Sequence, residues 1–396
     1  MSVTAAQGFL AGSVDAGLTV REGPNLTVVV NQGPSQAAAA VFTTNRATAH
    51  PIRWSKQAIM DGQVAAVVLN AGGANCFTGP EGFALTHTSA EKTADAVGVA
   101  LSTEVSAADV LVCSTGLIGE LLPAGAVIQG IEAAATVLSD SDEAGVAASL
   151  AIMTTDSVPK RSVVTGGSGE NTWTIGGMAK GAGMLAPGLA TMLVVITTDA
   201  DLDAPALDRA LREATRVSFD RLDSDGCMST NDQVTLMASG ASGVVPEGEE
   251  FQQALTSLCR DLAQQLLADA EGAHHDIAIR VTGAESDDEA VAIGRSVARN
   301  NLFKAAIFGK DPNWGRVLAA IGTVPAQFDV DRVDVWMNGV RVCSGGQPDR
   351  PRGDVDLTPR ATDLWIDIQG HGQASATVWS NDLTHDYVHE NSAYSS

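Results

Sequence analysis

Short apolar runs rich in β-branched residues alternate along this chain with segments of helical length, and this alternation restricts its folds most. Leu26–Val30, Val64–Asn70 and Asp109–Gly116 have the composition of buried strands. Ala204–Leu222 and Glu250–Gly272 carry apolar residues at spacings of three and four, as amphipathic helices do, and the second is expected to end at Gly272. Because the two kinds of segment follow no regular βαβ order, the sequence predicts a layered α/β sandwich rather than a doubly wound sheet.

The pattern changes after the second long helix. A strand, HDIAIRVTG, is followed by a predicted helix over 287–307 and then by two hairpin-like pairs of strands, RVDVWMNGVRVC and DLWIDIQGHGQASATVW. The GHG at Gly370–Gly372 is expected to form the turn of the second pair. The chain is therefore divided into an α/β catalytic domain (1–275), a smaller α+β domain (276–384) and a C-terminal tail (385–396).

Composition excludes several classes of partner. The formal net charge of −23 disfavours nucleic acid and anionic membrane surfaces, which both require clustered basic residues. The five cysteines are scattered and form no CxxC motif, which indicates a reducing compartment. We see no signal peptide and no apolar run of membrane-spanning length, so a cytoplasmic location is expected.

Two short motifs resemble metal sites but fail on their residue types. HDYVH (385–389) has histidines at i and i+4, but Asp386 stands where a zinc helix needs Glu. DRLDSDG (220–226) would place Arg221 at the first ligand position of a calcium loop. The pair His274-His275 is expected to be solvated at a helix end. The sequence therefore predicts no metal.

Two glycine-containing stretches follow predicted strands. NAGGANCFTG (70–79) is neither GxGxxG nor a P-loop, and we interpret it as a tight turn packed near a site. CSTGLIG (113–119) breaks at Thr115-Gly116, which is either a simple strand end or an oxyanion hole built from a hydroxyl and a glycine amide.

The stretch KGAGMLAPGLATMLVVITTDA (180–200) changes character in its middle. From Met192 onward it has the composition of a strand, but it enters this strand through Ala190-Thr191 after a glycine-rich loop and a lysine. Thr191 is either an ordinary residue at a strand edge or a nucleophile.

Blocks along the whole chain resemble one family. FTTNRA, NAGGANCFTG, CSTGLIGELLP, AIMTTDSVPK, KGAGMLAPGLATMLVVITTDA, SDGCMSTND, DAEGA, FGKDPNWGRVLAAIG and ENSAYSS resemble, in order, blocks of the ornithine acetyltransferase family, also called glutamate N-acetyltransferase. The resemblance implies a layered α/β fold with a smaller C-terminal domain, self-cleavage between Ala190 and Thr191 into an α chain (1–190) and a β chain (191–396), and an α2β2 assembly.

The implied reaction passes through Thr191. Its hydroxyl would take the acetyl group from N2-acetyl-L-ornithine, releasing L-ornithine, and L-glutamate would then accept the group to give N-acetyl-L-glutamate. The free α-amino group created by cleavage can serve as base for the hydroxyl, because it titrates near neutral pH. Thr115 and Gly116 match the family's oxyanion hole. No cofactor is implied, and acetyl-CoA as a second acetyl donor is left open.

The resemblance also assigns substrate-binding positions. We expect Lys180 to face the substrate carboxylate and Glu271 its amine, with a solvated helix-end charge as the alternative for Glu271 and Thr155 as a rival for Thr154. The C-terminal tail is expected to fold back over the Thr191 site. The positions are Thr154, Lys180, Thr191, Glu271, Asn391 and Ser396.

Three departures and two rival interpretations accompany this assignment. Gly188, Cys227 and the pair His274-His275 stand where relatives are expected to have other residues. If water accepted the acyl group, the chain would be an N-terminal-threonine aminopeptidase or amidase. A relative that never cleaves itself, with a structural Thr191, is the third interpretation.

Overall fold

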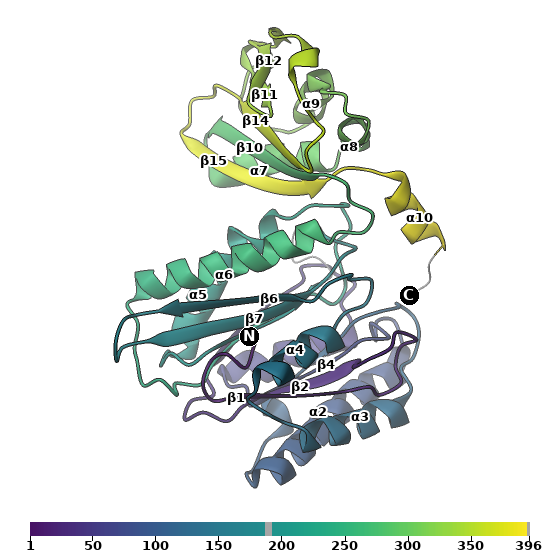
Figure 1. Cartoon of the computed structure of the whole chain (residues 1–396), viewed down its shortest axis with the longest axis vertical. Helices are drawn as coiled ribbons and strands as arrows, with labels where there is room; N and C mark the ends of the chain where they lie inside the picture. Colours follow the sequence, from purple (N-terminus) through teal and green to yellow (C-terminus); the bar gives the residue numbers. More distant parts are fainter. Residues whose placement is uncertain (187–191, 394–396) are drawn as a thin grey trace.

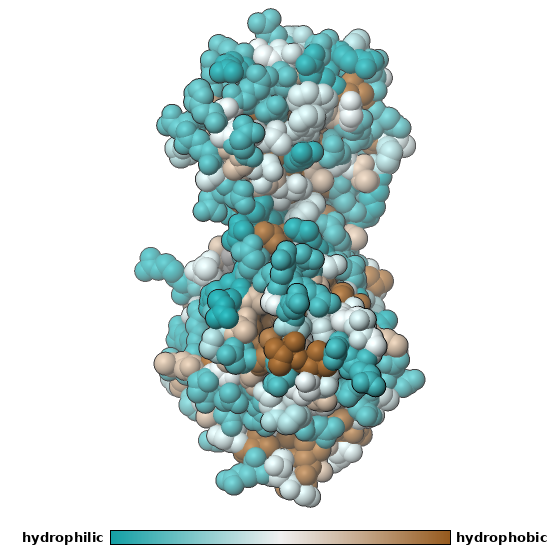
Figure 2. Space-filling model, turned by 90° about the vertical axis from the view of Figure 1, so that its left-hand side faces the viewer, coloured by the Kyte–Doolittle hydropathy of each residue, from teal (hydrophilic) through white to brown (hydrophobic). Residues whose placement is uncertain are grey.

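The computed structural model describes residues 1–186 and 192–393. Its larger part stacks four layers in the order helices, sheet, sheet, helices, and a smaller α+β part adjoins it (Figure 1). The two parts meet at a narrower waist, and their surface is mostly hydrophilic, as Figure 2 shows. The layered α/β class that the sequence predicted is confirmed.

The first sheet has the strand order β1-β2-β4-β5. Helices α2 and α3 cover its outer face with a separate apolar cluster, and α1 lies beside β5. Strands β4 and β5 run parallel, so the NAGGANCFTG and CSTGLIG segments both leave the sheet at the carboxyl ends of these strands. The elements are β1 (Phe9–Val14), β2 (Leu26–Asn31), β4 (Ala66–Asn70), β5 (Val110–Ser114), α1 (His50–Ala58), α2 (Gly79–Leu101) and α3 (Ala124–Thr136).

The second sheet has the order β3-β9-β8-β7-β6, with α5 and α6 on its outer face. Helix α5 begins where the Asp203 side chain accepts from the amide of Ala206 (2.8 Å). Side chains such as Phe9, Leu111 and Val195 fill the space between the sheets, together with residues of α4. The elements are β3 (Ala38–Phe42), β6 (Lys160–Gly166), β7 (Trp173–Lys180), β8 (Leu193–Thr198), β9 (Gln233–Ala238), α4 (Asp142–Ala151), α5 (Ala204–Arg216) and α6 (Gly248–Ala268).

The smaller part is a six-stranded sheet in the order β13-β12-β11-β14-β10-β15, with helices α7 to α9 packed on it around its own apolar core. Helix α10 follows the last strand and returns toward the larger part (Figure 1). The elements are β10 (Asp276–Ala284), α7 (Asp287–Ala298), α8 (Asn301–Phe308), α9 (Trp314–Ile321), β11 (Asp334–Met337), β12 (Val340–Ser344), β13 (Gln347–Pro348), β14 (Ala361–Asp367), β15 (Ala374–Asn381) and α10 (His385–Ala393).

The second predicted hairpin is wrong. Strands β14 and β15 do not pair with each other, because β10 lies between them, parallel to β14 and antiparallel to β15. The segment with Gly370–Gly372 therefore crosses over the end of β10 instead of making a two-stranded turn. At Gly372 it passes so close that a Cβ would lie 1.7 Å from the Ala284 carbonyl oxygen.

Three predicted helices differ from those observed. The helix expected over Ala204–Leu222 ends at Arg216, and a separate short helix, η3 (Phe219–Arg221), follows it. The helix expected over 287–307 is two helices, because the Asn300 side chain accepts from the amide of Phe303 (3.0 Å) and starts α8. The helix expected to reach Gly272 ends at Ala268. Gly272 has a left-handed φ of 59° and a different task, since a Cβ there would lie 2.2 Å from the Tyr387 amide of α10.

Candidate active site

A cavity of about 650 Å³ lies where β5 and β7 end and where α10 returns from the smaller part. Most of the residues that the sequence predicted as functional line it, namely Thr115, Gly116, Thr154, Lys180, Glu271 and Asn391. Its wall is completed by Thr155, Gly183, Met184, Asp225, Cys227, Tyr387, His389 and Glu390. The predicted nucleophile Thr191, with Ala190, Gly188 and the tail residue Ser396, lies outside the described residues.

The turn after β5 depends on glycines from two motifs. Gly116 has φ 127°, and a Cβ there would lie 2.6 Å from the amide nitrogen of Gly73. The Thr115 amide donates to the carbonyl of Asn70 (3.0 Å), which ties the turn to the end of β4. NAGGANCFTG therefore acts as the tight turn interpreted from the sequence, and its glycines let the backbone at Gly116 come close.

Lys180 is the central cation of the cavity. It is the last residue of β7 and is 1% exposed. Its Nζ donates to the Thr115 hydroxyl (3.1 Å) and to the Thr154 hydroxyl (2.8 Å). A threonine hydroxyl that accepts from an ammonium keeps its own proton for another acceptor. Thr115 can therefore donate into the cavity. Thr155 also lines the cavity, but Lys180 bonds to Thr154.

A buried carboxylate that the sequence analysis did not single out stabilises this cation. Asp156 accepts from the amides of Thr154 (3.0 Å) and Gly181 (2.7 Å) and pairs with Lys160. Burial raises the pKa of Asp156, but Lys180, Lys160 and these hydrogen bonds outweigh it, and the pKa is lowered. Burial lowers the pKa of Lys180, and Asp156 opposes that shift.

Glu271 and Asn391 meet at the wall of the same cavity. The Asn391 side-chain amide donates to the Glu271 carboxylate (2.9 Å), and the Glu271 amide donates to the Ala182 carbonyl (3.0 Å). Gly183 leaves the room for this carboxylate, because a Cβ there would lie 2.6 Å from each of its oxygens. Thr384 at the start of α10 bonds to the Gly272 carbonyl (2.6 Å). Glu271 is thus part of the cavity wall, a few residues beyond the end of α6.

A second missed carboxyl lies at the start of β8. Asp232 is fully buried, and its Oδ1 accepts from the amide of Met192 (3.0 Å), the residue that follows Thr191. Its Oδ2 has no hydrogen-bond partner within the described ranges. Burial raises the pKa of Asp232 well above its ordinary value. The available signal was its position directly before the strand that pairs with β8.

The histidines and the calcium-like motif have structural roles. His275 is buried, not solvated as expected, because its ring bonds to Asp382 (2.7 Å) and to the Leu357 carbonyl (3.0 Å) at the start of β10. His274 is exposed and pairs with Asp386 (2.7 Å). In DRLDSDG, Asp225 accepts from the amide of Met184 (2.7 Å) on the cavity wall.

A buried ammonium next to a threonine hydroxyl and a glycine turn is suited to stabilising a developing oxyanion, and the carboxylate opposite is suited to holding an amine. In a layered α/β fold with a smaller C-terminal part, this arrangement defines an acyl-transferring enzyme of amino-acid metabolism.

The chain belongs to the ArgJ family, whose pattern it matches over residues 10–396. It is 58% identical over 396 residues to the arginine biosynthesis bifunctional protein ArgJ of Streptomyces coelicolor, and 55% identical over 395 residues to that of Thermobifida fusca. Both alignments cover 100% of both chains.

Two solved chains are each similar to about half of the protein. The Mycobacterium tuberculosis ornithine acetyltransferase, complexed with ornithine, is 44% identical, with a TM-score of 0.45, over 48% of this chain and 96% of the other. The Bacillus halodurans ArgJ protein is 33% identical, with a TM-score of 0.48, over 50% and 97%. Among the described helices of the present chain, none is both long and apolar enough to cross a bilayer.

Proposed function

We propose that Thr191 carries the acetyl group in the reaction of this enzyme, with the residues of the cavity in the roles given below. The enzyme is a glutamate N-acetyltransferase of arginine biosynthesis, which moves the acetyl group of N2-acetyl-L-ornithine to L-glutamate. The observation that carries the proposal is the hydrogen bond from Lys180 to Thr115 beside the start of β8. β8 lies between β7 and β9, so the chain that enters it at Met192 arrives between Lys180 and Asp232.

The first half-reaction releases ornithine. The Thr191 α-amino group takes the proton of the Thr191 hydroxyl as the oxygen attacks the acetyl carbonyl. The negative charge that forms on the carbonyl oxygen is held by the Thr115 hydroxyl and the Gly116 amide, and the Lys180 ammonium behind Thr115 strengthens that donor. Collapse breaks the amide bond, the proton passes to the leaving α-amine of ornithine, and acetyl-Thr191 remains.

The second half-reaction repeats these steps in reverse order. The amine of glutamate attacks the acetyl ester through an oxyanion at the same donors, and Thr191 recovers its proton.

The Glu271 carboxylate, oriented by Asn391, holds the side-chain ammonium of ornithine. Lys180 supplies the positive charge that attracts the substrate carboxylate. Helix α10 limits the entry of water to the ester.

The assay for this function separates transfer from hydrolysis. Purified enzyme is incubated with N2-acetylornithine labelled in its acetyl group, with and without glutamate. Label is expected in N-acetylglutamate in proportion to ornithine released, and little free acetate is expected. Acetate formed at the same rate whether glutamate is present or absent would identify an amidase instead. A parallel incubation with labelled acetyl-CoA and glutamate tests the second donor.

Truncation of the chain end tests the role of the tail. Removing Tyr394 to Ser396 is expected to leave folding and self-cleavage intact, while raising KM for acetylornithine severalfold and releasing more acetate per ornithine. This expectation rests on α10, which holds Asn391 against Glu271 at the cavity wall directly before the truncated residues. Unchanged kinetics and an unchanged ratio of acetate to acetylglutamate would remove Ser396 from the site.

Substitution of Asp232 tests how the nucleophile is positioned. Asp232→Ala removes the acceptor of the Met192 amide and is expected to slow self-cleavage at least about tenfold, because a buried donor then loses its partner. Asp232→Asn keeps a carbonyl oxygen at that place and is expected to cleave at nearly the normal rate. The measurement is the fraction of cleaved chain against time. Equal rates for the alanine variant and the unaltered chain would show that Asp232 has no positioning role.

The assembly and the compartment are proposals as well. Self-cleavage would leave an α and a β chain that share the core between the two sheets, since that core contains residues from both sides of position 191. We propose that two such pairs form an α2β2 assembly in the cytoplasm. Sedimentation analysis of the cleaved enzyme measures the mass of the assembly.

A further inference from the structure

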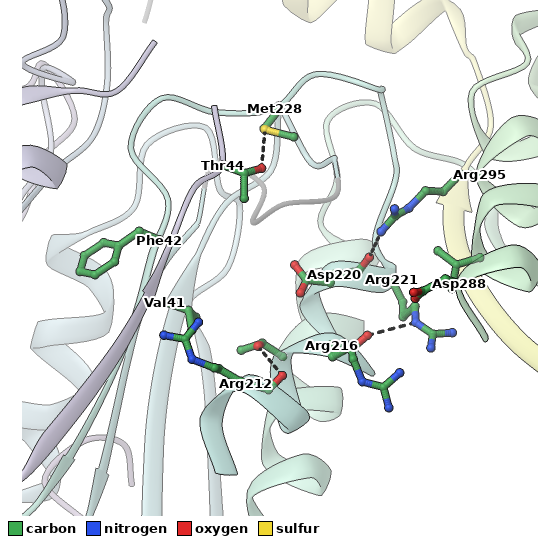
Figure 3. Close-up of a pocket in the computed structure, with 12 residues that line it drawn as sticks. Val41, Phe42, Thr44, Arg212, Arg216, Asp220, Arg221, Met228, Asp288 and Arg295 are labelled. Atoms are coloured by element: carbon green, nitrogen blue, oxygen red, sulfur yellow. Dashed lines mark hydrogen bonds between the residues drawn. The ribbon is translucent and has the colours of Figure 1, made fainter. Parts of the chain in front are cut away.

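A second cavity, of about 600 Å³, lies between the larger and smaller parts (Figure 3). Its floor is formed by α5 and the short helix η3 (Phe219–Arg221), one wall by β3 and the other by α7. Of the described residues, none lines both this cavity and the active-site cavity. Met228 lines one and its neighbour Cys227 the other, so the two cavities lie on either side of that segment.

The residues that line this second cavity have a net positive charge, whereas the protein as a whole is negatively charged. Four arginines and two aspartates line it, an excess of two positive charges in a chain whose net charge is −23. The arginines are Arg212, Arg216, Arg221 and Arg295. Like charges brought this close repel one another, and a site that keeps them together is suited to a multiply charged anion.

Two of these arginines have donors to spare within the part of the chain that the structure describes. Arg221 is 7% exposed, and its Nε donates to the carbonyl of Arg216 (3.1 Å). Arg295 reaches across from α7 and donates through Nη2 to the carbonyl of Asp220 (2.7 Å), while its buried Nε has no partner (Figure 3). Both guanidinium groups are held by backbone carbonyls, and neither pairs with a described carboxylate within 4.0 Å.

The other two arginines are more loosely engaged. Arg212 pairs with Asp208 (2.9 Å) and Arg216 with Glu213 (2.8 Å), one turn away on the same exposed helix face. Arg216 also lies 3.6 Å from the Asp287 carboxylate of α7. Exposed pairs of this kind contribute little to stability, because solvent and salt screen them. Burial, and after it the neighbouring Arg216 and Arg295, lower the pKa of Arg221, while Asp287 and Asp288 oppose that shift.

We propose that this cavity binds a small organic phosphate. Phosphate oxygens accept from several guanidinium forks at once, and a phosphate carries about the two negative charges that match the excess in the lining. Val41, Phe42 and Val291 provide an apolar surface beside the arginines for the organic part of the ligand. A cavity of this size holds a molecule of nucleotide dimensions.

Binding of inorganic pyrophosphate and ADP, measured by calorimetry at low salt, tests the proposal. Both are expected to bind the wild-type enzyme, ADP more tightly than pyrophosphate and pyrophosphate at least about tenfold more tightly than succinate, because a carboxylate engages one fork only. Raising the salt concentration is expected to weaken both. Arg221→Gln and Arg295→Gln are each expected to weaken binding about 10- to 100-fold.

Arg332→Gln, an exposed arginine of the smaller part outside this cavity, is the matched control and should bind as the wild type does. Thermal unfolding checks that each variant is folded, and should Arg221→Gln unfold, Arg295→Gln and Arg212→Gln decide. The proposal fails if wild-type enzyme binds neither ligand at millimolar concentration. It also fails if the folded cavity variants bind as tightly as the control, or if succinate binds as tightly as pyrophosphate.

Discussion

The Thr191→Ala variant is expected to remain a single chain of 40.7 kDa and to transfer no acetyl group. Both processes need the same hydroxyl, which first attacks the carbonyl of Ala190 and later the acetyl group of the substrate. Loss of a nucleophile of this kind typically costs at least about 10⁴-fold in turnover. A denaturing gel measures cleavage, with two bands of about half the mass expected from the unaltered enzyme.

Conservative variants separate a chemical defect from a folding defect. Thr191→Ser and Thr191→Cys keep a nucleophile and are expected to cleave, more slowly than the native chain. All three variants should unfold at similar temperatures, since each loses or exchanges at most two side-chain heavy atoms. Two fragments from Thr191→Ala would place the nucleophile elsewhere. A single band from the unaltered, active enzyme would show that cleavage is not required.

The Thr115→Ala variant is expected to lose about 10²–10³-fold in kcat, the usual effect of removing one oxyanion donor. KM for acetylornithine should change little, because the donor acts on charge that forms only in the transition state. Thr115→Ser retains the hydroxyl and should retain most of the activity. Steady-state kinetics of the correctly cleaved enzyme measure both constants.

Thr154→Ala is the matched control for that variant. It removes the other hydroxyl that accepts from Lys180, so both variants cost the ammonium one hydrogen bond. If the oxyanion role belongs to Thr115, Thr154→Ala should affect KM more than kcat. Equal losses of kcat would mean that the two threonines only position Lys180, and an unchanged kcat in Thr115→Ala would reduce CSTGLIG to a structural turn.

Local sequence patterns predicted many elements of the fold. Strands β2 (Leu26–Asn31) and β8 (Leu193–Thr198) lie where their apolar composition placed them, and every residue of both is buried. Helix α5 and the first part of α6 lie where apolar periodicity placed them, because each buries one face. The predicted hairpin RVDVWMNGVRVC is confirmed as the antiparallel pair β11 and β12, joined where Asn338 and Gly339 have left-handed backbone conformations. The position of these elements along the chain therefore needed no tertiary information.

Some of the residues that line the active-site cavity could also be predicted from the sequence. The motifs that resemble family blocks identified Thr115, Lys180 and Glu271, which the fold brings into one cavity. They did not identify Asp156 or Asp232. An aspartate has the same letter whether it is solvated or buried, and only the burial of these two, with their hydrogen bonds to Gly181 and Met192, distinguishes them.

What the sequence by itself determined is the kind and order of most elements, which depend on spacing along the chain, and, through the resemblance of its motifs to one family, the residue types expected for acyl transfer. Only the tertiary structure decided which strands are neighbours, as when β10 separates β14 from β15. The burial of His275 against Asp382 was visible only in the tertiary structure. The same is true of the cavity that Arg221 of the larger part and Arg295 of the smaller part both line. These contacts join residues tens of positions apart, and their energies depend on burial and distance in space, which no local pattern records.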